Sequence, residues 1–194
     1  MHVDAVISVS GSALTPEPPA AKGFTIERSA YTLDGNKVDL ASLAGGRSQL
    51  KQNDRLVMVL KVEAKATGGR ILLVDRLPAG LEIENPRLVD GGDIKALDWL
   101  KTTVKPEHAE FRDDRFVAAF NFFGGNVQAG RRRGGDDVDD DAKKEPMSQA
   151  TVAYIVRAVT PGSFVHPAAT VEDMYRPERY ARTASGRLEV VGKD

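Results

Sequence analysis

The stretch RLVMVLKVEA, residues 55–64, determines the predicted fold class, because its apolar side chains recur at every second position. One face carries Leu56, Met58, Leu60, Val62 and Ala64. The opposite face includes the charged residues Arg55, Lys61 and Glu63. A period of two is that of a β-strand, in which successive side chains point to opposite faces. The stretch therefore predicts a strand of an antiparallel sheet, with one buried face and one solvated face.

The same kind of segment recurs along the chain. Further strands are predicted at 71–75, 81–86, 115–122, 149–159, 163–171 and 187–191. The sequences LPAG, TPGS and ASGR between them place proline or glycine where a chain reversal needs a fixed or positive φ. Short strands at fairly regular spacing predict an all-β sandwich.

One short helix is predicted within GDIKALDWLKTTV, residues 92–104. Asp93 can cap its first turn, and Ile94, Leu97 and Leu100 fall on one helical face. Pro106 makes continuation beyond this stretch unfavourable.

The domain boundaries follow from composition. Residues 1–14 contain an alternating apolar segment and are interpreted as a strand of an adjoining region. Residues 15–23 hold three prolines and are predicted to form a semi-rigid linker. Residues 24–194 form the main domain. Within it, the stretch 124–145 is rich in glycine and contains runs of like charges, so it is predicted to be a flexible insertion.

Composition excludes several classes of function. Lys and Arg total 27 against 28 Asp and Glu, so a net charge of -1 argues against nucleic acid or an anionic membrane surface as partner. The absence of cysteine removes thiol nucleophiles, disulfides and thiolate metal sites. No apolar run reaches the ~20 residues of a membrane helix. We also expect no signal peptide at the start, MHVDAVIS.

Catalytic and metal motifs are weak. A calcium loop beginning at Asp137 would place Ala142 where glycine is required and Ser148 where a closing glutamate is required, so a solvated loop is the better interpretation. The histidines, at positions 2, 108 and 166, have no partner at metal-binding spacing and form no triad pattern. We therefore predict no enzyme activity, no cofactor and no metal site.

Two tyrosines stand in TVEDMYRPERYARTASGRL, residues 170–188, although only 6% of the chain is aromatic. Tyr180 is predicted to plug a loop against the core, with its hydroxyl bonded to backbone, as in a tyrosine corner. The same structural interpretation is open to Tyr175, and it is preferred for Tyr180.

Four stretches together resemble the C-terminal end of bacterial alpha-2-macroglobulins. They are GFTIERSAYTLDGNKVDLASLAGGRSQLKQNDRLVMVLKVEA, LLVDRLPAGLEIENPRL, EHAEFRDDRFVAAF and YIVRAVTPGSFVHPAATVEDMYRPERYARTASGRLEV. The resemblance runs from about Thr15 to Val191, and the insertion at 124–145 is its main departure. It implies an immunoglobulin-like macroglobulin β-sandwich, the last such domain of its parent protein.

The family resemblance also implies a function. Its members are large periplasmic protease traps anchored to the inner membrane, in which cleavage of a bait region exposes a Cys-Gln thioester that captures the protease. A cysteine-free domain would serve non-catalytically, with the thioester domain of the same polypeptide as its partner and target proteases reached through the full-length protein. Neither nucleic acid nor direct membrane insertion is expected.

The resemblance assigns Tyr175 to shielding that thioester from water, with Met174 packing beside it. Loop orientation through ion pairs is expected of the neighbouring charged residues Glu172, Asp173, Arg176, Glu178 and Arg179.

Two alternatives remain open from the sequence. One is a stand-alone β-sandwich that works in adhesion or ligand binding through its loops. The other is a hydrolase, which would need a concave site lined by the few histidines and by the clustered carboxylates of Glu110, Asp113 and Asp114.

Overall fold

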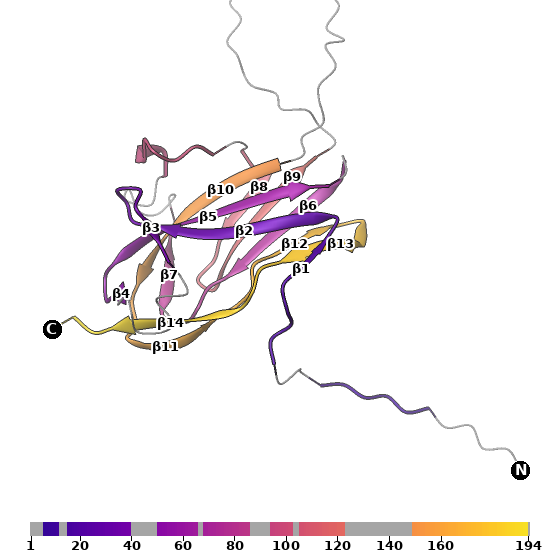
Figure 1. The fold of residues 1–194 in the computed structure, drawn as a ribbon, viewed down its shortest axis with the longest axis horizontal. Coiled ribbons are helices and arrows are strands. Elements are labelled where there is room, and N and C mark those ends of the chain that lie inside the picture. The colour runs from indigo at the N-terminus through magenta and orange to yellow at the C-terminus, as the bar shows by residue number, and fades with distance from the viewer. Residues whose placement is uncertain are drawn as a thin grey trace, which may run out of the picture.

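A computed structural model describes residues 6–11, 15–39, 50–65, 68–85, 94–102, 105–122 and 149–193. Within these ranges the chain consists almost entirely of β-strands arranged in three sheets (Figure 1). The six-stranded sheet contains, in spatial order, β1 (Ala20–Lys22), β13 (Arg176–Arg182), β12 (Thr170–Asp173), β6 (Arg70–Arg76), β9 (Arg115–Asn121) and β8 (His108–Phe111). The predicted all-β class is confirmed.

A five-stranded sheet packs against the first sheet. It contains β3 (Lys37–Val38), β2 (Phe24–Tyr31), β5 (Arg55–Ala64), β10 (Gln149–Ala158) and β7 (Leu81–Glu84). The third sheet, of β11 (Gly162–His166), β14 (Gly186–Val191) and β4 (Leu50–Lys51), extends from one end, where β14 and β4 are parallel. Apolar side chains from the two larger sheets form one continuous core, so the molecule is a β-sandwich.

Strand β5 shows how the sequence pattern becomes packing. Leu56, Met58, Leu60 and Val62 are buried in the main core, as the alternation predicts. The opposite face is less solvated than predicted, because Val57 is also fully buried. It belongs to a second, smaller cluster on the outer face of the five-stranded sheet.

The segment that covers this outer face is the predicted helix, and that prediction is wrong in extent. Among the residues of this stretch that the structure describes, only Ile94–Ala96 is helical, as a single 3-10 turn. The Trp99 ring lies 5.2 Å from the Tyr31 ring, and its Nε1 donates to the Leu33 carbonyl at 2.8 Å. These contacts with the sheet outweigh helix propensity, which is a weak preference in a short segment. The proposed cap, Asp93, lies outside the described residues.

A buried polar network joins the two large sheets. Asp75 in β6 accepts from Arg28 Nη1 at 2.7 Å and from the Tyr154 hydroxyl at 2.8 Å. The Tyr154 ring stacks on Phe116 with centroids 4.7 Å apart. Burial raises the pKa of Tyr154 well above its ordinary value, so the phenol stays protonated and can donate. Buried polar groups with such partners fix the relative position of the sheets.

The described N-terminal residues include one short strand. Residues 6–11 are in no strand, and Val6, Ile7 and Val9 are exposed. The range predicted as a linker includes β1, whose three residues pair with β13. The predicted insertion at 124–145 lies outside the described residues. Among the described residues, no helix combines the length and apolar character needed to cross a membrane.

The network predicts the result of replacing Tyr154 by phenylalanine. Loss of the hydroxyl leaves one oxygen of the buried Asp75 without its donor, so Tyr154→Phe should lower the free energy of unfolding by about 1–3 kcal/mol in urea titrations. Tyr31→Phe, a matched change in a half-buried tyrosine, should change it by less than about 0.5 kcal/mol. Equal effects of the two changes would contradict the role given to the Asp75 network.

Candidate functional site: the β12–β13 turn

Met174 and Tyr175 form the two-residue turn between β12 and β13. Asp173 pairs with Arg176 across this turn, and β13 continues beside β1 (Figure 1). The Tyr175 side chain is 76% exposed and that of Met174 is 45% exposed. Two large exposed side chains thus project from one tight turn, which makes this turn a candidate contact surface.

Asp173 holds this turn from inside the protein. Its side chain is 1% exposed. Oδ1 accepts from the Tyr175 backbone N–H at 3.1 Å, and Oδ2 accepts from Arg176 Nε at 2.8 Å. Arg179 Nη1 lies 3.5 Å from the same Oδ2. A carboxylate that accepts a backbone N–H two residues later closes an Asx turn, so Asp173 fixes the backbone that carries Tyr175.

A glycine pair supplies the wall behind this carboxylate. The Gly68 carbonyl accepts from Arg176 Nη2 at 3.0 Å and from Arg179 Nη1 at 3.3 Å. Gly69 has φ +142°, and a Cβ there would lie 2.8 Å from Asp173 Oδ2. Only glycine fits such a close approach in that backbone conformation. We call Asp173, Arg176, Arg179, Gly68 and Gly69 the turn clamp.

An irregularity in the β12–β13 ladder turns Arg179 toward the clamp. Glu172 pairs with Tyr180, whereas the next residue, Asp173, pairs with Arg176, which leaves residues 177–179 as extra residues on β13. Bulges of this kind redirect side chains. Here the Arg179 guanidinium lies 5.0 Å above the Phe24 ring, and its side chain is only 14% exposed.

The structure brings together some of the predicted site residues and not others. Asp173, Arg176 and Arg179 form the expected ion pairs, and the carboxylate that they share is buried. Glu172 and Glu178 point to solvent, and neither side chain has an ion-pair partner within the described ranges. The sequence interpretation missed Gly68 and Gly69, although adjacent glycines before a strand are a recognisable signal of close backbone approach.

Tyr180 does not have the expected plugging role. Its ring is half-buried, with Lys22 Nζ 5.3 Å and the Arg182 guanidinium 5.9 Å from its centroid. The buried, hydrogen-bonded tyrosine of the core is Tyr154. Tyr180 instead packs along the edge of the six-stranded sheet, where it pairs with Lys22 of β1.

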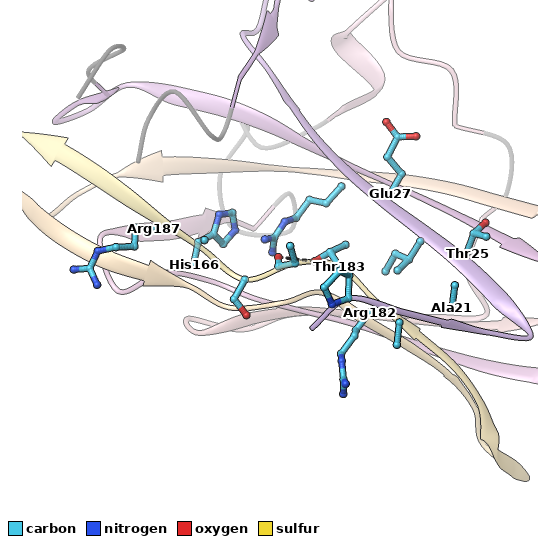
Figure 2. Close-up of a pocket in the computed structure, with 14 residues that line it drawn as sticks. Ala21, Thr25, Glu27, His166, Arg182, Thr183 and Arg187 are labelled. Carbon is cyan, nitrogen blue, oxygen red and sulfur yellow. Dashed lines mark hydrogen bonds between the residues drawn. The ribbon is translucent and has the colours of Figure 1, made fainter. Parts of the chain in front are cut away.

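A hollow of about 780 Å³ lies between β1, β2 and the connection from β13 to β14 (Figure 2). His166 lines it and is 3% exposed. Burial, followed by the nearby Arg28 charge, lowers the pKa of His166 to about 3, so the ring is neutral near pH 7. Its Nε2 has no hydrogen-bond partner among the described residues.

The carboxylates considered for hydrolysis lie elsewhere, around the β8–β9 turn. Glu110 bonds to His108 and Arg112, and Asp114 bonds to Arg115. Hydrogen bonds from Arg112 and His108 lower the pKa of Glu110 to about 2, the opposite of what a general acid needs. Glu110, Asp113 and Asp114 do not line the hollow of Figure 2. This cluster has the features of a solvated ion-pair network.

No group of three or more His, Asp or Glu side chains in the described part of the chain could hold a metal ion. The residues of the considered calcium loop, from Asp137 to Ser148, lie outside that part.

Comparisons with known proteins find similarity to bacterial alpha-2-macroglobulins. A family model described as "Bacterial Alpha-2-macroglobulin MG10 domain" matches residues 23–129 and 133–178. Alpha-2-macroglobulin of Escherichia coli (strain K12) is 33% identical over 193 residues, which cover 95% of this chain and 10% of that protein. The chain therefore spans about a tenth of the length of this relative.

Solved structures give the same likeness. The native conformation of the E. coli alpha-2-macroglobulin matches with a TM-score of 0.68 and 30% identity, covering 93% of this chain and 10% of that one. Salmonella alpha-2-macroglobulin reacted with methylamine matches with a TM-score of 0.66 and 31% identity, with the same two coverages.

The turn clamp predicts a difference between two neighbouring acidic residues. Asp173→Ala leaves two guanidinium groups without their shared carboxylate and should lower the free energy of unfolding by about 3 kcal/mol, as breaking a buried ion pair does. Glu172→Ala, the matched exposed change, should alter it by less than about 0.5 kcal/mol. Urea denaturation measures both values, and a small effect of Asp173→Ala would contradict the clamp.

The lowered pKa of the buried His166 ring predicts that the stability of the domain depends on pH. Its pKa is lower in the folded chain than in the unfolded chain, so the unfolded chain binds a proton first and stability falls as pH drops through about 6.5. Between pH 7 and pH 5 the loss should be roughly 2 kcal/mol. His166→Leu should abolish this loss, whereas His108→Gln, at an exposed histidine, should retain it. An unchanged pH profile in His166→Leu would show that another group is responsible.

Proposed function

The chain belongs to the bacterial alpha-2-macroglobulin family as an MG10 domain, and from this membership we propose that it is a non-catalytic shield for a thioester in a separate domain of the same polypeptide. The proposal needs a partner elsewhere in the polypeptide, because this chain has no cysteine to form a thioester. It is consistent with a chain that spans about a tenth of its E. coli relative.

The exposed ring of Tyr175 on a clamped turn is the observation that carries the proposal. A thioester persists only while water and amines are kept away from its carbonyl. An aromatic ring covers a large area, and a ring on a rigid turn loses little conformational entropy when it docks. The turn clamp supplies that rigidity, and Met174 extends the apolar surface beside the ring.

Release is the second part of the proposal. Contacts between domains of one chain are typically moderate in size and partly polar, so a rearrangement can separate them. We infer that cleavage of the bait region by a target protease moves this domain away from the thioester, which then reacts with the attacker. We also infer that the parent protein acts in the periplasm, anchored to the inner membrane, as the family resemblance implies.

The proposal is tested in the full-length parent protein. Tyr175→Gly should speed inactivation of the thioester by methylamine about tenfold, which corresponds to roughly 1.4 kcal/mol of lost protection. Methylamine is a suitable probe because the Salmonella relative has been obtained after reaction with it. The rate is measured as loss of thioester under pseudo-first-order conditions.

Two controls accompany this measurement. Val165→Ala, which shortens another exposed apolar side chain on β11, should leave the methylamine rate unchanged. The 194-residue chain carrying Tyr175→Gly should unfold in urea within about 0.5 kcal/mol of the unaltered chain, because the ring is exposed. An unchanged methylamine rate in full-length Tyr175→Gly removes the tyrosine from the shielding role.

A further inference from the structure

The chain enters the sandwich along the strand that carries the Tyr175 turn. Residues 17–23, here called the entry strap, lie beside the C-terminal half of β13. Ala20–Lys22 pairs with Tyr180–Arg182, and Gly23 bridges to Tyr180. Arg182 donates from Nε to the Pro18 carbonyl at 2.7 Å and forms an ion pair with Glu17. Ala21 and Arg182 are both among the residues that line the hollow (Figure 2).

Arg179 contacts both the strap and the turn clamp. On the strap side, a Cβ added to Gly23 would lie 3.2 Å from Arg179 Cγ and Nε, so the backbone there touches the arginine stem. The guanidinium stacks over Phe24, the residue that follows the strap. On the clamp side, Nη1 donates to the Gly68 carbonyl and faces Asp173 Oδ2.

We propose that Arg179 is a positioning residue that couples the entry strap to the Tyr175 turn, so that movement of the strap away from β13 loosens the turn. Its use in regulation rests on the proposed shielding function, because only then does loosening the turn uncover a reactive bond. The coupling itself is a property of this chain and can be tested without a thioester.

The coupling has its physical basis in the Arg179 guanidinium, which contacts both the entry strap and the turn clamp. While the strap and Phe24 cover it, Arg179 is largely withdrawn from water, and its attraction to the Asp173 carboxylate is weakly screened. If the strap leaves, water reaches the guanidinium, the pair weakens, and Asp173 holds the Tyr175 N–H less firmly. A pull on the chain before residue 17 would therefore reach a turn that lies more than 150 residues later in the sequence.

Hydrogen exchange of the 194-residue chain measures this coupling. The reporters are the Met174 and Tyr175 amides, which donate to Arg70 and Asp173 respectively. Gly23→Ala disturbs the strap, because Gly23 has φ +83° and no room beside Arg179, and Arg179→Gln removes the guanidinium. Each change should speed exchange of both reporters about tenfold, while amides in the central β5–β10 ladder change by less than about twofold.

The double variant distinguishes coupling from two independent defects. If Arg179 transmits the disturbance, Gly23→Ala adds nothing to exchange at the turn once Arg179→Gln is present. The matched control is Gly186→Ala, since a Cβ at Gly186 would meet no atom within 4 Å, and it should leave the reporters unchanged. Additive effects of Gly23→Ala and Arg179→Gln, or no effect of Gly23→Ala on the turn, would overturn the proposal.

A second route covers the case in which Gly23→Ala does not fold. Glu17→Gln together with Arg182→Gln removes the ion pair of the strap and the Arg182 bond to the Pro18 carbonyl, without adding a side chain at the positive φ of Gly23, and it should speed reporter exchange in the same way. Unchanged exchange in that variant also overturns the coupling. Neither result depends on methylamine, so failure of the coupling and failure of the shielding function are separate outcomes.

Discussion

The burial of one carboxylate, Asp173, is the constraint on which the functional end of this domain depends. A charged group withdrawn from water must be paired and hydrogen-bonded, and Asp173 meets this need with two guanidinium groups and the Tyr175 backbone N–H. The same bonds that stabilise the charge also hold the turn. The exposed Tyr175 ring is therefore attached to a fixed backbone rather than to a free loop.

The sandwich provides the support for this arrangement. Strand β6 pairs with β12, so the Gly68–Gly69 wall and the Asp173 carboxylate are held by one sheet. The same strand carries Asp75, whose bonds to Arg28 and Tyr154 connect it to the opposite sheet. Two buried carboxylates thus have different tasks. Asp75 joins the layers in the core, and Asp173 shapes the end of the sheet.

Local pattern predicted β5, β6, β7, β9, β10 and β14, but it missed β2 and β13 and merged β11 with β12 into one strand. It also failed where contacts come from distant segments. The alternation in β5 identified the buried Leu56 and Met58, but it could not reveal that Trp99 covers Val57 from the other side. The Asp173 wall is formed by Gly68 and Gly69, about one hundred residues earlier, a pairing that spacing in one sequence does not encode. Glu172 points outward because successive side chains of β12 alternate between the two faces of the sheet. The period of two therefore already places Glu172 and Asp173 on opposite faces.

The most direct test of the shielding role is a structure of the complete parent chain before bait cleavage. If Tyr175 protects the thioester, its ring will lie in van der Waals contact, within about 4.5 Å, of the groups that enclose the thioester carbonyl. A ring that points into bulk solvent, far from an intact thioester, would contradict that role.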